Sequence, residues 1–218
     1  MLNVVLIGPQ GSGKGTQADL IVEEFGLEPI EAGALIRKRA AQHDKKAEII
    51  DHLANKKGEL LPDGIVLDMI YEELEERESE QGYLFDGFPR TAKQYQALQE
   101  LLVDRHWQLD VAIIFKISDA AAVRRLGARR HCEACGKSYS LAWEPERERC
   151  DCGGELTRRA DDSEEGIRKR LELFHATTEP VLDLMGEDGI LVEVDGERGV
   201  EEIFLEIKDK LNEIRQDR

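Results

Sequence analysis

The sequence predicts an α/β fold, a doubly wound parallel sheet, and two observations carry the prediction. Short apolar runs occur at residues 2–7, 83–85, 111–117 and 190–194, and Pro29-Ile30 could form a brief fifth strand. Helical patterns separate these runs. Strands that are apolar on both faces and alternate with helices are typical of a parallel sheet with helices on its two sides.

The elements follow in order along the chain. The first strand leads into a helical pattern over 13–25, and residues 37–80 form a polar, all-helical stretch. The glutamates between 72 and 80 are expected to form a solvated helix face: Glu72, Glu73, Glu75, Glu76, Glu78 and Glu80. Near the C-terminus one apolar stripe predicts a helix: Val200, Ile203, Phe204, Ile207, Leu211 and Ile214.

Composition excludes several classes of protein. The 218 residues contain 30 Lys and Arg against 46 Asp and Glu, a net charge of −16, which argues against nucleic acid and anionic membranes as partners. No apolar run approaches the roughly 20 residues of a membrane span. The first residues lack the basic region of a signal peptide, so a cytoplasmic protein is expected.

The strongest motif is GPQGSGKGT at 8–16, between a predicted strand and a predicted helix. Glycines let backbone N–H groups close around phosphate oxygens, the helix N-terminus favours an anion, and Lys14 can reach the β- and γ-phosphates. Gly15 follows Lys14 where many NTPases have the magnesium-binding Ser or Thr, and the hydroxyl arrives only at Thr16. This favours an enzyme of the P-loop NTPase type that holds magnesium through phosphates and water.

Together with further motifs, this loop resembles the adenylate kinase family of nucleoside monophosphate kinases, over essentially the whole chain. The other motifs are DGFPR at 86–90, Arg129-Arg130, RADD at 159–162 and RKR at 168–170. The cysteine-bearing insert resembles the lid of the bacterial long-lid type. The resemblance implies reversible, magnesium-dependent transfer, ATP + AMP = 2 ADP, with ATP, AMP and ADP as ligands.

The resemblance also implies a division of the chain and a set of site residues. The core would comprise 1–30, 82–130 and 160–218, the helical NMP-binding region 31–75, and the metal-binding lid 131–158. Catalysis would use Lys14, Arg90, Arg125, Arg129, Arg159 and Arg170. ATP would contact Gly11, Ser12, Gly13, Lys14, Gly15, Thr16, Arg125, Arg129 and Arg198. AMP would contact Ala32, Arg37, Glu59, Leu60, Leu61, Gly87, Arg90, Gln94, Arg159 and Arg170. Asp86 would bind magnesium through water.

The acceptor region departs from the family pattern. The family usually has Thr-Gly-Asp where this chain has Ala32-Gly33-Ala34, and an Ala before the Gly also occurs in UMP/CMP kinases. Gln94, in contrast, stands where adenylate kinases place an amide that reads adenine. We therefore expect AMP as acceptor, with UMP or CMP as the alternative. A second departure is Gly127, one position earlier than the family's glycine before the arginine pair; a glycine at a helix end supplies a hinge or a left-handed residue.

The insert carries all four cysteines: Cys132, Cys135, Cys150 and Cys152. Four thiolates can make a tetrahedral site, which we expect to hold one structural zinc, with iron or cobalt as alternatives. Because the second pair is C-x-C where C-x-x-C is common, Asp151 or His131 could replace Cys152 as the fourth ligand. Residues 131–157 carry three basic and six acidic side chains, which argues against nucleic-acid binding.

The sequence therefore favours a monomeric adenylate kinase with a metal-stabilised lid. A protein that binds ATP as a scaffold without turnover is the alternative from another class. The many arginines argue against it, because binding alone would not need them around the transferred group.

Overall fold

The structure is a computed structural model that describes residues 1–42, 44–56, 59–141, 146–158 and 162–216. Its centre is a five-stranded sheet in the order β2-β3-β1-β4-β8. All neighbouring strands are parallel, as predicted. The strands are β1 (Val4–Ile7), β2 (Glu28–Glu31), β3 (Tyr83–Asp86), β4 (Val111–Lys116) and β8 (Leu191–Asp195).

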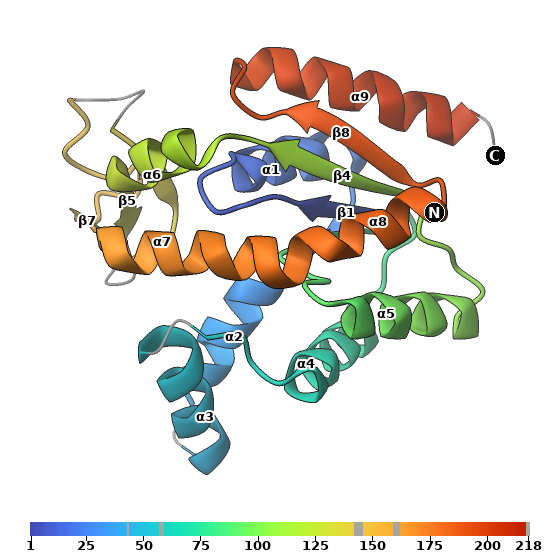
Figure 1. Cartoon of the computed structure of the whole chain (residues 1–218), viewed down its shortest axis with the longest axis horizontal. Coiled ribbons are helices and arrows are strands. Elements are labelled where there is room, and N and C mark those ends of the chain that lie inside the picture. The colour runs from blue at the N-terminus through green and yellow to red at the C-terminus, as the bar shows by residue number, and fades with distance from the viewer. Residues whose placement is uncertain (43, 57–58, 142–145, 159–161, 217–218) are drawn as a thin grey trace.

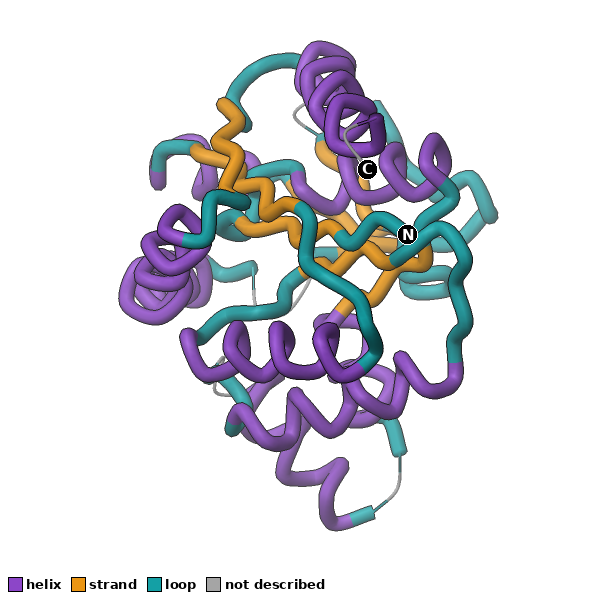
Figure 2. Tube along the Cα trace, turned by 90° about the vertical axis from the view of Figure 1, so that its right-hand side faces the viewer, coloured by secondary structure: helices purple, strands orange, loops and turns teal. Residues whose placement is uncertain are grey.

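Helices cover both faces of this sheet (Figures 1 and 2). Alternate side chains of β1 and β4 point to opposite faces, because successive residues of a strand do so. Val4 and Leu6 pack with α1 (Lys14–Phe25) and α9 (Val200–Gln216), whereas Val5 and Ile7 pack with the helices of the other face. Those helices are α2 (Ala32–Ala40), α3 (Lys45–Ile50), α4 (Asp63–Glu76), α5 (Ala92–Asp104) and α8 (Glu179–Glu187).

The predicted helical stretch after residue 37 contains α2, α3, the π-helical segment η1 (Asp51–Lys56) and α4. In Figure 1, α2 and α3 project from the sheet on the side opposite α9. The expectation that all six glutamates of this stretch are solvated is wrong for Glu73, which is 5% exposed. Arg77 forms ion pairs with Glu73 of α4 and with Glu28 of β2, and these two ion pairs together join α4 to the edge of the sheet.

The C-terminal stripe forms the buried side of α9. Ile203, Ile207 and Leu211 are buried against α1 and the sheet, while Val200 is 45% exposed. Val200 is the first residue of the helix, and the tight packing begins one turn later. The stripe is therefore confirmed except at its first position.

A second, three-stranded antiparallel sheet follows α6 (Asp119–Gly127), in the order β6-β5-β7. Its strands are β5 (Arg129–Cys132), β6 (Ser138–Ser140) and β7 (Leu156–Thr157). Gly127 ends α6 and is not among the described residues with positive φ, so it supplies no left-handed backbone there. From this sheet the chain returns through α7 (Glu164–Leu173) and the π-helical segment η2 (Phe174–Thr178) to α8.

Candidate active site and lid metal centre

The loop between β1 and α1 is shaped to receive an anion. Gly11 and Gly13 have φ of 88° and 91°, a backbone conformation that glycine adopts without strain. Gly13 caps α1 without a side chain, so the first-turn N–H groups of the helix remain available to a ligand. A side chain at Gly8 would bring its Cβ within 2.8 Å of Ser12 Oγ. Close packing therefore restrains the backbone of this loop at Gly8, and the first-turn amides of α1 are available to a phosphate.

Positive charge gathers beside this loop at the end of β3. Burial lowers the pKa of Lys14; the carboxylate of Asp86 opposes that shift, and the charges of Arg90 and Arg129 add to it. Burial likewise lowers the pKa of Arg90, again against the effect of Asp86. Arg90 Nε donates to the carbonyl of Gly87 at 2.8 Å, which holds the guanidinium at the turn after β3. Lys14 and Arg90 thus share Asp86 as an acidic neighbour, with the charge of Arg129 acting on Lys14 as well, an arrangement that an anionic ligand would stabilise.

One carboxylate oxygen of Asp86 is available to a ligand. Its Oδ1 is buried, and among the described residues it has no hydrogen-bond partner. A buried, unpaired acceptor is costly unless a ligand or water fills it. The charge of Asp86 also raises the pKa of Asp19 and of Glu31, in both cases in addition to burial. The charge of Asp86 therefore acts on several titratable groups around the loop, and Asp86 lies at the end of β3.

Asp162 aligns two of the predicted catalytic arginines. Its side chain is fully buried and accepts from Arg129 Nε at 2.8 Å, from Arg129 Nη2 at 2.6 Å and from Arg170 Nη2 at 2.8 Å. Burial acts to raise the pKa of Asp162, but these hydrogen bonds outweigh it, and the pKa lies below its ordinary value. Sequence reasoning gave Asp162 no role, although the RADD motif that contains it was the available signal. Arg159, in the same motif, lies outside the described residues.

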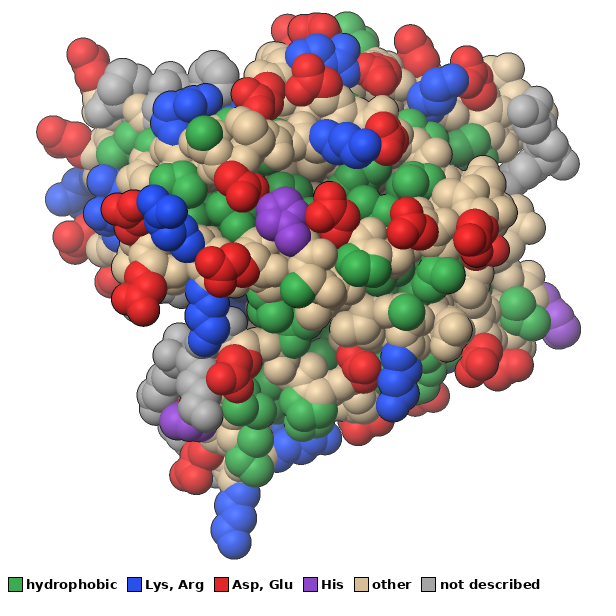
Figure 3. Space-filling model, in the orientation of Figure 1, with side chains coloured by type: hydrophobic (Ala, Val, Ile, Leu, Met, Phe, Trp, Pro, Cys, Tyr) green, Lys and Arg blue, Asp and Glu red, His purple; other side chains and the backbone are tan. Residues whose placement is uncertain are grey.

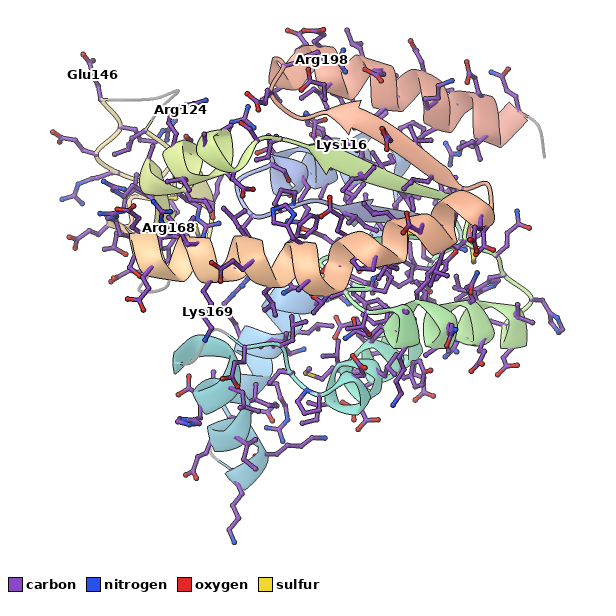
Figure 4. All side chains as sticks on the ribbon, viewed as in Figure 1. Lys116, Arg124, Glu146, Arg168, Lys169 and Arg198 are labelled. Atoms are coloured by element: carbon purple, nitrogen blue, oxygen red, sulfur yellow. The ribbon has the colours of Figure 1, made fainter. Side chains whose placement is uncertain are left out.

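Two more arginines were predicted to contact ATP: Arg125 lies on α6, and Arg198 lies just before α9. Arg125 Nη1 donates to the carbonyl of Gly196 at 2.7 Å and lies 3.4 Å from the carbonyl of Gly11. Arg198 pairs with Glu202 and Glu206 of α9 (Figure 4). The charge of the Arg198 side chain is thus already neutralised by two glutamates of α9. Thr16 is exposed at the first turn of α1.

The predicted acceptor residues lie along α2, the segment before α4 and the turn before α5. Ala32 is buried at the first position of α2, and Arg37 is exposed one turn further on. Leu61 is buried, Leu60 is half-buried and Glu59 is exposed. Gly87 has a φ of 74° and leads into Arg90. Gln94 is 2% exposed, and both atoms of its amide are hydrogen-bonded.

The lid sheet brings the four cysteines together. Their sulfur atoms all lie within 4.8 Å of one another, with Cys132 and Cys150 buried and Cys135 and Cys152 exposed. Hydrogen bonds, first from the Tyr139 hydroxyl, lower the pKa of Cys150 to about 6. The Gly154 N–H lowers the pKa of Cys152, but the three neighbouring sulfurs outweigh it and raise it to about 12. Four such thiols cannot all ionise without a cation, so the donor set fits a thiolate-bound metal.

Neither alternative ligand belongs to the cluster found among the described residues, which consists of the four cysteines. Asp151 accepts from Lys137 Nζ at 2.8 Å and from Arg147 Nη1 at 2.6 Å, and these bonds lower its pKa. His131 Nδ1 lies 3.2 Å from the carbonyl oxygen of Thr157. A side chain at Gly154 would place its Cβ 2.5 Å from Cys132 Sγ, so the backbone closes tightly around the sulfurs. The geometry favours Cys152 over both alternatives.

Sequence reasoning gave no role to His175. His175 Nε2 lies 3.0 Å from Asp119 Oδ1 at the start of α6, and Nδ1 lies 2.8 Å from Glu179 Oε2. These two partners, Glu179 first, raise the pKa of His175. The i,i+4 spacing of His175 and Glu179 was the available signal.

A five-stranded parallel sheet, a glycine-rich phosphate loop and converging arginines define a phosphotransferase of the P-loop class. The adenylate kinase family model matches residues 6–190. Adenylate kinases of Archaeoglobus fulgidus and Bacillus subtilis are 38% and 36% identical, covering 98% and 99% of this chain and the whole of each relative. The adenylate kinase of Bacillus pumilus is 39% identical over 96% of this chain and 98% of the relative. The chain belongs to the adenylate kinase family and is a nucleoside monophosphate kinase.

Among the described helices, none is long and apolar enough to cross a bilayer. On the face shown in Figure 3, acidic and basic side chains are interspersed, as on a solvated surface.

Proposed function

We propose that this chain interconverts ATP and AMP with two molecules of ADP and that the cations around Asp86 carry the reaction. The observation that carries the proposal is the cluster of Lys14, Arg90 and Arg129: the charges of both arginines lower the pKa of Lys14, and Asp86 opposes the shifts at Lys14 and Arg90. Two phosphorylated substrates would supply the missing negative charge. Phosphoryl transfer needs positioning and charge neutralisation more than covalent chemistry, and this site provides both.

In the proposed reaction an oxygen of the AMP phosphate attacks the γ-phosphorus of ATP. The bond from that phosphorus to the bridging oxygen breaks, and the bridging oxygen remains on the departing ADP. No general base is needed, because the AMP phosphate is already anionic at neutral pH. Lys14 and the loop amides bind the β- and γ-phosphates, while Arg129 and Arg170 stabilise the charge on the transferred group. Arg125 would hold the phosphate loop against the start of α9, and Arg159 would act beside Arg170.

For the acceptor, Arg37 and Arg90 would bind the AMP phosphate. Ala32, Leu61 and Gly87 would border the nucleoside, with the backbone at Glu59 and Leu60. Gln94 would read the base. Arg198 would contribute to ATP binding through its backbone, since its guanidinium is held by α9.

The residues present fit magnesium bound through water. The unpaired Oδ1 of Asp86 is a hard oxygen ligand at the phosphate site. Bound there, magnesium would neutralise charge on the β- and γ-phosphates. Gly15 offers no hydroxyl that could bind the ion directly.

The lid site would hold one structural zinc on Cys132, Cys135, Cys150 and Cys152. Four sulfurs leave no open position for a substrate, which is typical of a structural site.

We further propose that residues 31–75 and the lid, 131–158, close over the core formed by 1–30, 82–130 and 160–218. Closure would exclude water, which otherwise competes with AMP as acceptor. In Figure 4, Lys169 projects from α7 toward α2 and α3, which belong to one of the segments proposed to move. We propose that the chain acts as a monomer in the cytoplasm.

The test is nucleoside diphosphate formation from Mg-ATP with AMP, UMP, CMP and GMP in parallel. AMP should exceed the other acceptors, and Lys14→Met should lower kcat by about 10³-fold, because an essential charge at the γ-phosphate is lost. An exposed lysine, Lys210→Met, serves as the matched control. UMP or CMP ahead of AMP would assign the specificity to the Ala32 region. No turnover with any acceptor would leave ATP binding as the function.

A further inference from the structure

The amide of Gln94 is held from two sides. Its Oε1 accepts from the backbone N–H of Arg90 at 2.8 Å, and its Nε2 donates to Asp63 Oδ1 at 2.8 Å. Asp63, at the start of α4, also accepts from the Thr91 hydroxyl at 3.0 Å. These bonds join α4 to the first turn of α5, beside the arginine proposed to bind the acceptor phosphate.

The two partners leave the amide only one orientation. An N–H group can face only the oxygen of Gln94, and a carboxylate can face only its NH₂ group. Turning the amide over would place two donors together at Arg90 and two acceptors together at Asp63. Both amide atoms keep one free valence, a second lone pair on Oε1 and a second N–H on Nε2. The order of acceptor and donor that Gln94 can offer to a base is therefore fixed.

Bases differ in the order of hydrogen-bond donor and acceptor along the edge that would face the Gln94 amide. Adenine and cytosine have an amino donor beside a ring-nitrogen acceptor, whereas guanine and uracil have a keto acceptor beside a ring N–H donor. An amide that could turn over would pair with either kind. An amide that cannot turn over pairs with one kind and leaves unpaired polar groups against the other, which is how binding sites discriminate most strongly.

We infer that Asp63 is a positioning residue that locks the Gln94 amide and thereby makes the acceptor site select amino-bearing bases over keto-bearing ones. This inference rests on the proposed function, because it takes AMP as the acceptor. Asp63 touches neither phosphate nor reacting atoms in this account. Substitution of Asp63 should therefore change the KM for the acceptor and the ratio of kcat/KM between acceptors, while kcat for AMP is retained.

The experiment compares kcat/KM for AMP and GMP, two purines, in the wild-type chain and in Asp63→Asn. The asparagine keeps the size of the side chain but can face either end of the Gln94 amide, so that only the Arg90 N–H still opposes the turned-over orientation. We expect the AMP:GMP ratio to fall by about tenfold or more, through KM. The CMP:UMP ratio should fall in the same direction. Asp68→Asn is the matched control on the same helix, since Asp68 is exposed and its nearest cation, Lys46, lies 3.9 Å away.

Thr91→Val provides a second route if Asp63→Asn folds poorly. It removes the hydrogen bond to Asp63 and the N-cap bond from the Gln94 N–H, and it should lower the AMP:GMP ratio by a smaller factor. Thr91→Ser keeps the hydroxyl, both bonds and the ratio. A selective wild type together with variants that keep its ratio would overturn the inference and leave the proposed function intact. Equal use of AMP and GMP by the wild type would also overturn it. A wild type that does not phosphorylate AMP would instead overturn the proposed function.

Discussion

At the scale of single residues, the carboxylate of Asp162 holds two arginines that we propose act in catalysis, and it also stabilises the fold. Hydrogen bonds from Arg129 and Arg170 outweigh burial and lower its pKa in the folded chain. Such a group stabilises the fold above its unfolded pKa, about 3.9, and this contribution is lost as the pH falls through the lower folded pKa. Asp162→Asn should therefore cost about 3 kcal/mol of unfolding free energy at pH 7, because two arginines lose their charged partner.

Denaturant unfolding at a series of pH values checks this. The difference in unfolding free energy between wild type and Asp162→Asn should stay constant from pH 7 to about 5 and narrow below about 4, where the carboxyl begins to protonate in the unfolded chain while it stays ionised in the folded chain. Asp209→Asn, an exposed position on α9, should change the unfolding free energy by less than about 0.5 kcal/mol. A difference for Asp162→Asn that stays constant down to pH 3 would contradict the stated origin of the stabilisation.

At the scale of elements, the lid sheet is too small to be stable by packing alone. Its strands have two to four residues, and among the described residues its buried cluster consists of Cys132, Tyr139 and Cys150, with Leu156 packed against it. The proposed metal would supply the remaining stability. We expect Cys152→Ser to lower the bound metal well below one per chain and to lower the Tm by about 5 °C or more, while Asp151→Asn keeps the metal.

Elemental analysis of the purified variants, followed by thermal melts with and without a chelator, checks this prediction. Asp151→Asn is the matched control, because it changes the neighbouring residue and removes the ion pairs with Lys137 and Arg147 but no sulfur. Loss of metal from Asp151→Asn with retention by Cys152→Ser would reverse the ligand assignment. Equal Tm values for metal-loaded and metal-free wild type would exclude a structural role for the metal.

The same contrast between elements explains how much the sequence could predict. Strands β1 and β4 were predicted because burial on both faces makes them continuously apolar. Strand β2 was only partly indicated, since this edge strand carries Glu28 and Glu31. The lid strands gave no strand signal, because they are short and polar. At the site, the phosphate loop was predictable from local spacing. The bonds of Asp162 to Arg129, 33 residues away, and of Asp63 to Gln94, 31 residues away, depend on the completed fold.

At the scale of the whole molecule, the proposed division into core, NMP-binding region and lid leads to a prediction about motion. A compound with two adenosines joined by a chain of phosphates would occupy both proposed nucleotide sites at once. Its phosphates would bring Arg37 of α2 and Arg129 of β5 toward the same anion, so both inserts should close on the core. The anion would also remove the repulsion among Lys14, Arg90 and Arg129.

Hydrogen exchange with and without this compound measures the closure. Amides of α2–η1 and of the lid should slow by about tenfold or more, because local opening then requires loss of the ligand. Amides of β1 and β4, which are already buried in the core, should change little. Arg37→Ala should weaken the protection of α2–η1 more than that of the lid, since Arg37 belongs to the first insert alone. Equal slowing throughout the sheet, α2–η1 and the lid would indicate uniform stabilisation by binding and would contradict the division into two closing parts.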